Sequence, residues 1–146
     1  MIVTIIGTGL IGGSMALTLK EKGLATKVIG VDANEQHLSQ ALALGIIDEA
    51  ASLNEAVALS DLMIIATPIN AAENLLPQIL DLVDKQVIMD VGSTKKNICK
   101  IASAHPKRGR FVATHPMWGT EYSGPEAAVN NAFTDKAAVI CSKEDS

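Results

Sequence analysis

A glycine-rich turn near the start of the chain has the spacing of a phosphate-binding motif. Gly7, Gly9 and Gly12 follow an apolar, β-branched run over residues 1–6, and a helical pattern begins directly after them. In such a turn the first glycine permits the bend, the second admits a pyrophosphate, and the third lets helix and strand pack closely. Free N–H groups at the positive end of the helix dipole then face the phosphates. The residues expected to contact a dinucleotide here are Gly7, Thr8, Gly9, Leu10, Ile11 and Gly12.

An acidic residue follows the next expected strand, at a distance that suits a ribose. Asp32 ends the apolar run 27–31 and lies 20 positions after Gly12. A carboxylate at this offset can accept a hydrogen bond from a ribose 2′-hydroxyl, and it would repel a 2′-phosphate. No Arg or Lys occurs in residues 33–36. The pattern therefore predicts NAD rather than NADP as the cofactor, against the alternative of a glycine turn that binds nothing.

Two residues farther along the chain have side chains suited to catalysis. His115 follows the expected strand 110–113, and imidazole can accept a hydroxyl proton near neutral pH while hydride leaves the same carbon. The alternative is a structural turn histidine. Ser93 follows the expected strand 86–91 and has two compatible uses. It can cap a helix that begins near residue 94, and it can place its hydroxyl beside the nicotinamide or the His115 ring.

Thr67 and Pro68 stand at the end of another expected strand, 61–66. Ligands of open α/β sheets bind beyond the carboxyl ends of the strands. Thr67 either satisfies a backbone group there or contacts the ligand, and Pro68 stops the strand because proline cannot continue the ladder. Together with Ser93, these two residues complete the expected cofactor contacts; the sequence indicates no metal ligands.

Four other polar residues are expected to be solvated. His37 falls on the polar side of an expected surface helix, and His105 lies in a basic turn. Lys95 and Lys96 open a helix, which is unfavourable for the helix dipole. Either one of these lysines faces an anionic ligand or, as we expect, both point into solvent.

The expected strands and helices alternate along the chain. Strands are expected over residues 1–6, 27–31, 61–66, 86–91, 110–113 and 137–141. Helices are expected from residue 10 to about 20–23, over 34–44, 53–59 and 70–83, and from about 94 to 104. This order predicts an α/β fold: a single domain, residues 1–146, with a doubly wound, mainly parallel Rossmann-type sheet. Pro77 is expected to kink or divide its helix.

Composition narrows the function classes. The net charge is −4 and no basic patch is visible, so nucleic acid is not expected as a partner. No apolar run approaches the roughly 20 residues that span a bilayer, and no secretory leader is recognisable, so no membrane association is expected. The two cysteines suggest no disulfide framework. A cytoplasmic location is the expectation.

Taken together, these stretches resemble the prephenate dehydrogenase family, which includes arogenate and cyclohexadienyl dehydrogenases. The similar segments are 7–14, 45–50, 66–68, 90–95, 115–119 and 121–124. The resemblance implies NAD-dependent oxidative decarboxylation of prephenate to 4-hydroxyphenylpyruvate, a step in tyrosine biosynthesis. It also implies that His115 hydrogen-bonds the substrate hydroxyl and that Ser93 orients this histidine near the nicotinamide.

Two features depart from the family pattern. Trp118 stands where a small residue is usual, which could reshape the substrate mouth. In addition, the family continues with a helical C-terminal half that forms a homodimer and supplies an arginine for the substrate. The 146 residues are therefore expected to be the cofactor-binding half, inactive alone, with an exposed apolar face where the other half docks.

Other functions stay open on the sequence. The substrate could be arogenate instead of prephenate, or the chain could belong to a β-hydroxyacid or imine oxidoreductase. A non-catalytic nucleotide-sensing module is the alternative from a different class.

Overall fold

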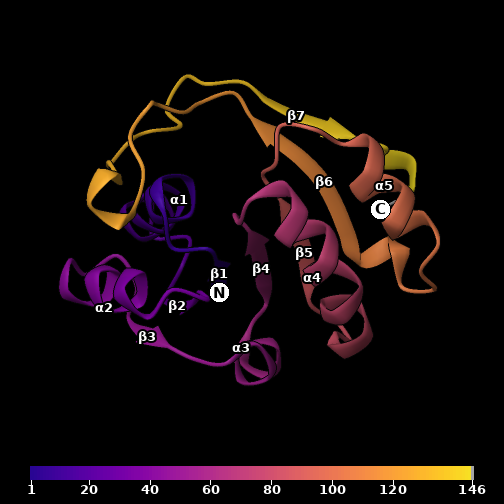
Figure 1. Ribbon diagram of the computed structural model, residues 1–146, viewed down its shortest axis with the longest axis horizontal. Helices are drawn as coiled ribbons and strands as arrows, with labels where there is room; N and C mark the ends of the chain where they lie inside the picture. Colours follow the sequence, from indigo (N-terminus) through magenta and orange to yellow (C-terminus); the bar gives the residue numbers. More distant parts are fainter. Residues whose placement is uncertain (146) are drawn as a thin grey trace.

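The computed structural model describes residues 1–145 and contains one seven-stranded sheet (Figure 1). The strands lie in the order β3-β2-β1-β4-β5-β6-β7. All neighbouring pairs are parallel except β6–β7, which is antiparallel. The bounds are β1 Ile2–Ile6, β2 Lys27–Val31, β3 Glu49–Ala50, β4 Leu62–Ile65, β5 Val87–Asp90, β6 Phe111–Pro116 and β7 Ala138–Cys141. The expected mainly parallel α/β sheet is confirmed.

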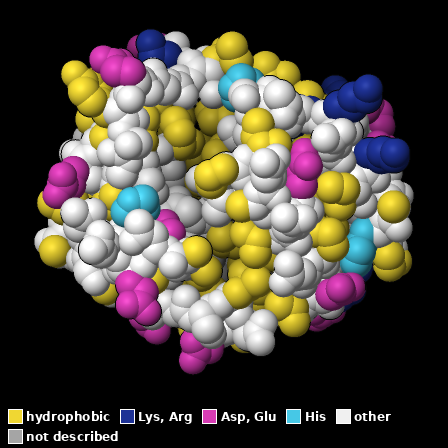
Figure 2. All heavy atoms as spheres, viewed as in Figure 1, with side chains coloured by type: hydrophobic (Ala, Val, Ile, Leu, Met, Phe, Trp, Pro, Cys, Tyr) yellow, Lys and Arg dark blue, Asp and Glu magenta, His cyan; other side chains and the backbone are white. Residues whose placement is uncertain are grey.

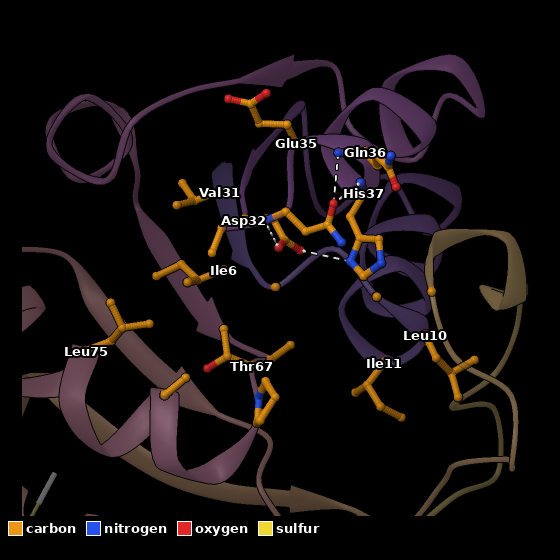
Figure 3. A pocket seen from close by; sticks show the side chains of 18 of the residues that line it. Ile6, Leu10, Ile11, Val31, Asp32, Glu35, Gln36, His37, Thr67 and Leu75 are labelled. Atoms are coloured by element: carbon orange, nitrogen blue, oxygen red, sulfur yellow. Dashed lines mark hydrogen bonds and ion pairs between the residues drawn. The ribbon is translucent and has the colours of Figure 1, made fainter.

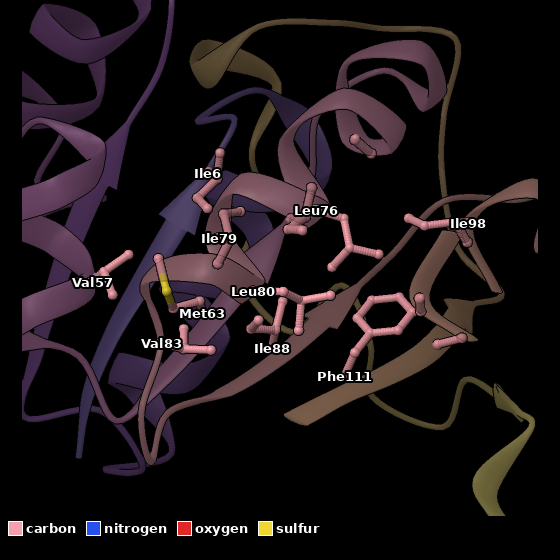
Figure 4. Packing of buried hydrophobic residues seen from close by; sticks show 14 residues of the cluster. Ile6, Val57, Met63, Leu76, Ile79, Leu80, Val83, Ile88, Ile98 and Phe111 are labelled. Atoms are coloured by element: carbon pink, nitrogen blue, oxygen red, sulfur yellow. The ribbon is translucent and has the colours of Figure 1, made fainter. Parts of the chain in front are cut away.

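Helices cover both faces of this sheet, as parallel strands buried on both sides require (Figure 1). They are α1 Leu10–Glu21, α2 Glu35–Ala43, α3 Leu53–Leu59, α4 Ile69–Leu82 and α5 Lys96–Ser103. Successive side chains of β4 point to opposite faces: Met63 and Ile65 pack beneath α3, α4 and α5, whereas Ile64 packs with α1 and α2. Figure 4 shows the first cluster, where Leu76, Ile79 and Leu80 of α4 meet the strand residues. The sheet is therefore held rigidly between two apolar layers.

The first turn of α2 is fixed by its own sequence. The Asn34 side chain accepts hydrogen bonds from the backbone N–H groups of Gln36 and His37, at 2.9 and 3.3 Å. This capping satisfies N–H groups that have no partner within the helix. At the other end, Gly45 adopts φ +68°, a left-handed conformation that ends helices. The helix position directly after Asp32 is thus well defined.

Two sequence expectations about element boundaries are wrong. The strand expected at 110–113 runs on to Pro116, because β7 pairs with it as far as the Pro116–Ala138 register. His115 therefore lies within β6 and not after it. Of the two alternatives for Pro77, division of the helix does not occur, since Pro77 lies inside α4. The last helix, expected from about residue 94, begins at Lys96 with Lys95 as its N-cap, so Ser93 does not cap it.

The segment between β6 and β7 crosses back over the first half of the molecule (Figure 1). Its short 3₁₀ turn η2, Pro125–Ala127, lies against α1 and α2. Ser14 in α1 accepts a hydrogen bond from the Val129 N–H at 3.0 Å, and Gln40 of α2 donates to Glu126 at 3.2 Å. The segment also holds Trp118, whose ring packs edge-on against Phe133 at 5.3 Å between centroids. This return brings distant residues next to the glycine turn.

Among residues 1–145, none of the helices combines the length and the apolar character needed to cross a membrane.

Candidate functional site

The three glycines of the turn occupy three different environments. Gly7 has φ +95°, and a Cβ there would lie 2.7 Å from the carbonyl oxygen of Ala66. At Gly12 a Cβ would lie 2.1 Å from the Gly7 carbonyl oxygen, so α1 can approach β1 only because this residue is glycine. At Gly9 a Cβ would meet nothing within 4 Å. The turn therefore packs tightly through Gly7 and Gly12 and leaves the space beside Gly9 open for a ligand.

The start of α1 offers hydrogen-bond donors to that open space. Its N-cap is Gly9, and no side chain caps the first turn. No acidic residue lies in this turn either, so the N–H groups and the positive end of the helix dipole are not neutralised. A pyrophosphate beside Gly9 would accept hydrogen bonds from these N–H groups, and its negative charge would lie at the positive end of the helix dipole.

A cavity of about 1320 Å³ opens at the carboxyl ends of the strands. Figure 2 shows that the molecule is hollowed on this face, and Figure 3 shows the side chains that line the cavity. Seven of the ten expected cofactor residues line it: Gly7, Gly9, Leu10, Ile11, Asp32, Thr67 and Pro68. Thr8, Gly12 and Ser93 are not among the lining residues. Gly12 acts through packing, because a Cβ at this position would overlap the Gly7 carbonyl oxygen.

Asp32 is held rigidly at the end of β2 (Figure 3). Its Oδ2 accepts hydrogen bonds from the Thr8 backbone N–H at 2.8 Å and the Thr8 hydroxyl at 3.0 Å, while Oδ1 accepts from the Asn34 N–H at 2.9 Å. Thr8 is fully buried, so it contributes by orienting Asp32 rather than by touching a ligand. The side chain of Asp32 keeps 13% of its surface exposed, towards the cavity. A carboxylate with free lone pairs is thus fixed where a ribose diol can donate to it.

Thr67 follows β4 on the opposite wall of the cavity. Its Oγ1 is buried and has no hydrogen-bond partner among the described residues. The expectation that this hydroxyl satisfies a backbone group at the strand end is therefore wrong. A buried hydroxyl without a partner is costly, and a ligand group in the adjoining cavity would satisfy it. Together with Gly9, α1 and Asp32, this residue shows that the site suits a dinucleotide.

Ser93 and His115 lie at the same edge of the sheet, one and two strands beyond β4. Ser93 follows β5 by three residues and is exposed, whereas His115 is half-buried within β6 and paired with Val139 of β7. Because β4, β5 and β6 are parallel, their carboxyl ends lie side by side. Neither residue lines the cavity described above. The structure therefore places both beyond the Thr67 wall, on the side away from Asp32.

A buried ion pair connects the Ser93 loop with β6. Asp90 is 1% exposed and accepts hydrogen bonds from the N–H groups of Gly92, at 3.1 Å, and Thr114, at 3.2 Å. Lys95 pairs with the same carboxylate, and its side chain is only 13% exposed. The expectation that Lys95 is solvated is therefore wrong. Burial with three partners gives Asp90 a structural role, and one of these partners, Thr114, directly precedes His115 in the neighbouring strand.

Sequence reasoning missed several residues of the site. His37 keeps solvent exposure, as expected, but it also lines the cavity, where its Nδ1 lies 3.7 Å from Asp32 Oδ2. Tyr122, Ser123 and Gly124 reach the cavity only because the segment after β6 folds back. Asn34 is a recognisable N-cap residue and could have placed His37, three positions later, on the first turn of the helix. His105 was also expected to be solvated, yet it is 14% exposed and its Nε2 lies 3.0 Å from Asp81 Oδ1.

Comparison with known proteins identifies the family. The family described as "Prephenate dehydrogenase, nucleotide-binding domain" matches residues 15–146. The chain belongs to the prephenate dehydrogenase family. Prephenate dehydrogenase of Bacillus subtilis is 37% identical over 153 residues, which cover 94% of this chain and 41% of that protein. The expected family and the expected class of ligand, a nucleotide, are confirmed.

Solved structures of the same family have the same fold. Prephenate dehydrogenase from Aquifex aeolicus, in complex with hydroxyphenyl propionate and NAD⁺, superimposes with a TM-score of 0.90 at 30% identity, covering 99% of this chain and 51% of that one. Arogenate dehydrogenase from Synechocystis gives a TM-score of 0.86 at 27% identity, over 96% of this chain and 49% of that one. The chain thus spans about half the length of the relatives that it matches.

Proposed function

We propose that the chain is the NAD-binding part of a dehydrogenase that converts prephenate to 4-hydroxyphenylpyruvate. The observation that carries the proposal is the cavity in which the open space at Gly9 and the fixed carboxylate of Asp32 meet. This arrangement matches a pyrophosphate followed by a ribose diol. The family membership and the NAD⁺ in the Aquifex aeolicus relative support the same cofactor.

Asp32 supports NAD over NADP on electrostatic grounds. Its carboxylate cannot turn away, because Thr8 and Asn34 hold both oxygens. A 2′-phosphate would lie against this fixed negative charge, whereas a 2′-hydroxyl can donate a hydrogen bond to it.

The order of the strands supports a direction for the bound cofactor. With the adenosine ribose at β2 and the pyrophosphate at β1, the nicotinamide end would extend past Thr67 of β4. Ser93 and His115, which follow β5 and lie in β6, would then be next to it. When bound, the oxidised nicotinamide supplies the acceptor for a hydride.

Residues of this chain would accept and return the proton in this reaction. His115 accepts the hydrogen bond of the substrate hydroxyl and takes its proton as hydride leaves the same carbon. Loss of the ring carboxylate as CO₂ then provides the electron pair that makes the ring aromatic, and the proton returns to the phenolic oxygen. Prephenate and NAD⁺ thus give 4-hydroxyphenylpyruvate, CO₂ and NADH without net proton release. Ser93 orients the His115 ring.

Groups outside these residues complete the active site in this proposal. The chain spans 41% of the Bacillus subtilis relative, which supports a substrate-binding half that lies elsewhere and through which the full enzyme forms a homodimer. Exposed apolar side chains at β7, Val139 and Ile140, are consistent with such a contact. We also propose a cytoplasmic setting, in keeping with the biosynthetic reaction.

Two measurements test the proposal. Titration of the chain with NAD⁺ by calorimetry should give saturable one-site binding. The chain extended by the remaining length found in its relatives should form NADH when supplied with prephenate. NADH formation with arogenate but not with prephenate would make arogenate the substrate. NAD⁺ binding without turnover of either compound would indicate a nucleotide-sensing module.

A further inference from the structure

His37 occupies a position from which it can act on the cofactor. It lies in the first turn of α2, and the Asn34 cap fixes this turn directly beyond the end of β2. The imidazole points into the cavity (Figure 3), with Nδ1 3.7 Å from Asp32 Oδ2 and with 36% of the side chain exposed. Asp32 Oδ2 already accepts two hydrogen bonds from Thr8. The ring therefore lies beside the carboxylate that is expected to accept a hydrogen bond from the ribose.

His37 is also the one residue of the cavity lining that can carry a positive charge. Among the described lining residues there is no Lys or Arg, and the other ionisable groups are Asp32, Glu35 and Tyr122. The elements packed against α2 add no cation that is free. On β3, Glu49 pairs with Lys27 of β2, and on η2, Glu126 accepts from Gln40. The charge beside the ribose position is thus set by Asp32 and His37.

We propose that His37 is a second specificity-determining residue of the cofactor site. Imidazole is the side chain that changes charge between about pH 5 and 8. When His37 is neutral, the full negative charge of Asp32 excludes a 2′-phosphate. When His37 is protonated, its charge offsets that of Asp32 and attracts the phosphate. The difference in affinity between NAD⁺ and NADP⁺ then becomes smaller. The inference rests on the proposed NAD⁺ binding at this cavity.

The experiment compares two cofactors at two pH values. The dissociation constants of NAD⁺ and NADP⁺ are measured by calorimetry at about pH 8 and about pH 6, on either side of the usual imidazole range. In the unmodified chain, the ratio of the NADP⁺ constant to the NAD⁺ constant should fall about fivefold or more at the lower pH. In His37→Gln the same ratio should fall about fivefold less, because glutamine keeps a polar side chain but gains no charge.

Two further variants sharpen the comparison. His37→Arg places a permanent cation at the same position, so NADP⁺ should bind at least about fivefold tighter at pH 8. His105→Gln is the matched control, since His105 also pairs with a carboxylate, that of Asp81, but lies outside the cavity lining. It should retain the pH dependence of the unmodified chain. Titration of the 2′-phosphate itself is common to all variants and cancels between them.

The outcomes separate this inference from the proposed function. If the unmodified chain binds NAD⁺ and its selectivity changes with pH equally in His37→Gln, His37 does not set specificity and the inference is overturned. If NAD⁺ does not bind the unmodified chain at either pH, the proposed function fails first. Thermal unfolding of each variant shows whether it is folded, and His37→Arg provides a gain of NADP⁺ affinity that misfolding cannot imitate.

Discussion

At the scale of single residues, the glycines of the turn have different roles: some permit close packing of the fold, and one leaves space for a ligand. A Cβ at Gly12 would overlap the Gly7 carbonyl oxygen, whereas one at Gly9 would stand in open space. The sequence motif alone predicted these tasks, and the geometry agrees with all three. The role of Thr8 was different from the one expected, because whether a threonine faces the ligand or its neighbour depends on a backbone direction that spacing does not encode.

The pair Gly9→Ala and Gly12→Ala should separate these tasks. Gly12→Ala should lower the free energy of unfolding by about 2 kcal/mol or more, because backbone must move to accommodate the methyl group. Gly9→Ala should change stability by less than about 1 kcal/mol but weaken NAD⁺ binding, since its methyl group enters the ligand space. Chemical denaturation and calorimetry measure the two quantities. Equal loss of stability in both variants would contradict the division.

Asp32→Asn tests the ribose contact. The amide can still accept hydrogen bonds from Thr8 through one oxygen, so the fold should be retained. NAD⁺ should bind about tenfold more weakly, because a hydrogen bond to a charged acceptor is worth about 1.5–3 kcal/mol. NADP⁺ should lose less affinity, or gain some, as the repulsive charge is removed. Unchanged affinity for both cofactors would mean that the ribose does not lie against Asp32.

At the scale of elements, local signals predicted most strands and helices, and the exceptions come from contacts between distant segments. The ends of β6 were misjudged because its last residues are held by β7, more than 20 positions later in the chain. The start of α5 was misjudged because Lys95 pairs with Asp90. Lys95 was expected to be solvated, since charged side chains usually are, and only its pairing with Asp90 shows otherwise.

Asp48 connects three elements and should give them a pH-dependent stability. Burial disfavours its charged form, but hydrogen bonds from Lys20 and from the Val28 N–H outweigh this and lower the pKa of Asp48 below 3.8. Its stabilising contribution is therefore complete above about pH 4 and is lost as the pH falls through the lowered, folded-state value.

Asp48→Asn should accordingly cost about 1 kcal/mol at pH 7, a modest figure because the side chain is 39% exposed and water screens the ion pair. The difference from the unmodified chain should shrink below the pKa of Asp48. Urea denaturation at several pH values measures this. A difference that stays constant from neutral to strongly acidic pH would show that the charge of Asp48 does not contribute.

At the scale of the whole molecule, the cavity and the two candidate catalytic residues lie along one edge of the sheet. The cavity lies at the carboxyl ends of β1, β2 and β4, whereas Ser93 follows β5 and His115 lies in β6. The sequence predicted that these strand ends lie along one edge of the sheet, because the carboxyl ends of parallel strands share one edge. It could not predict that residues 122–124 complete the cavity, since their position depends on the crossing of the segment after β6.

In the extended enzyme, His115→Asn should lower kcat by about 10²–10⁴-fold, the usual contribution of a positioned general base. The NAD⁺ dissociation constant should change little, because His115 does not line the cofactor cavity. Steady-state assays with prephenate measure the first quantity and calorimetry the second. A kcat equal to that of the unmodified enzyme would remove His115 from the reaction.

The most direct test of the central claim is a crystal structure of this chain with NAD⁺. We expect electron density with the pyrophosphate beside Gly9 at the start of α1, the adenosine ribose diol donating to Asp32, and the nicotinamide extending past Thr67 towards His115. Cofactor density that leaves Asp32 without a ribose contact, or no density at the glycine turn under saturating NAD⁺, would contradict it.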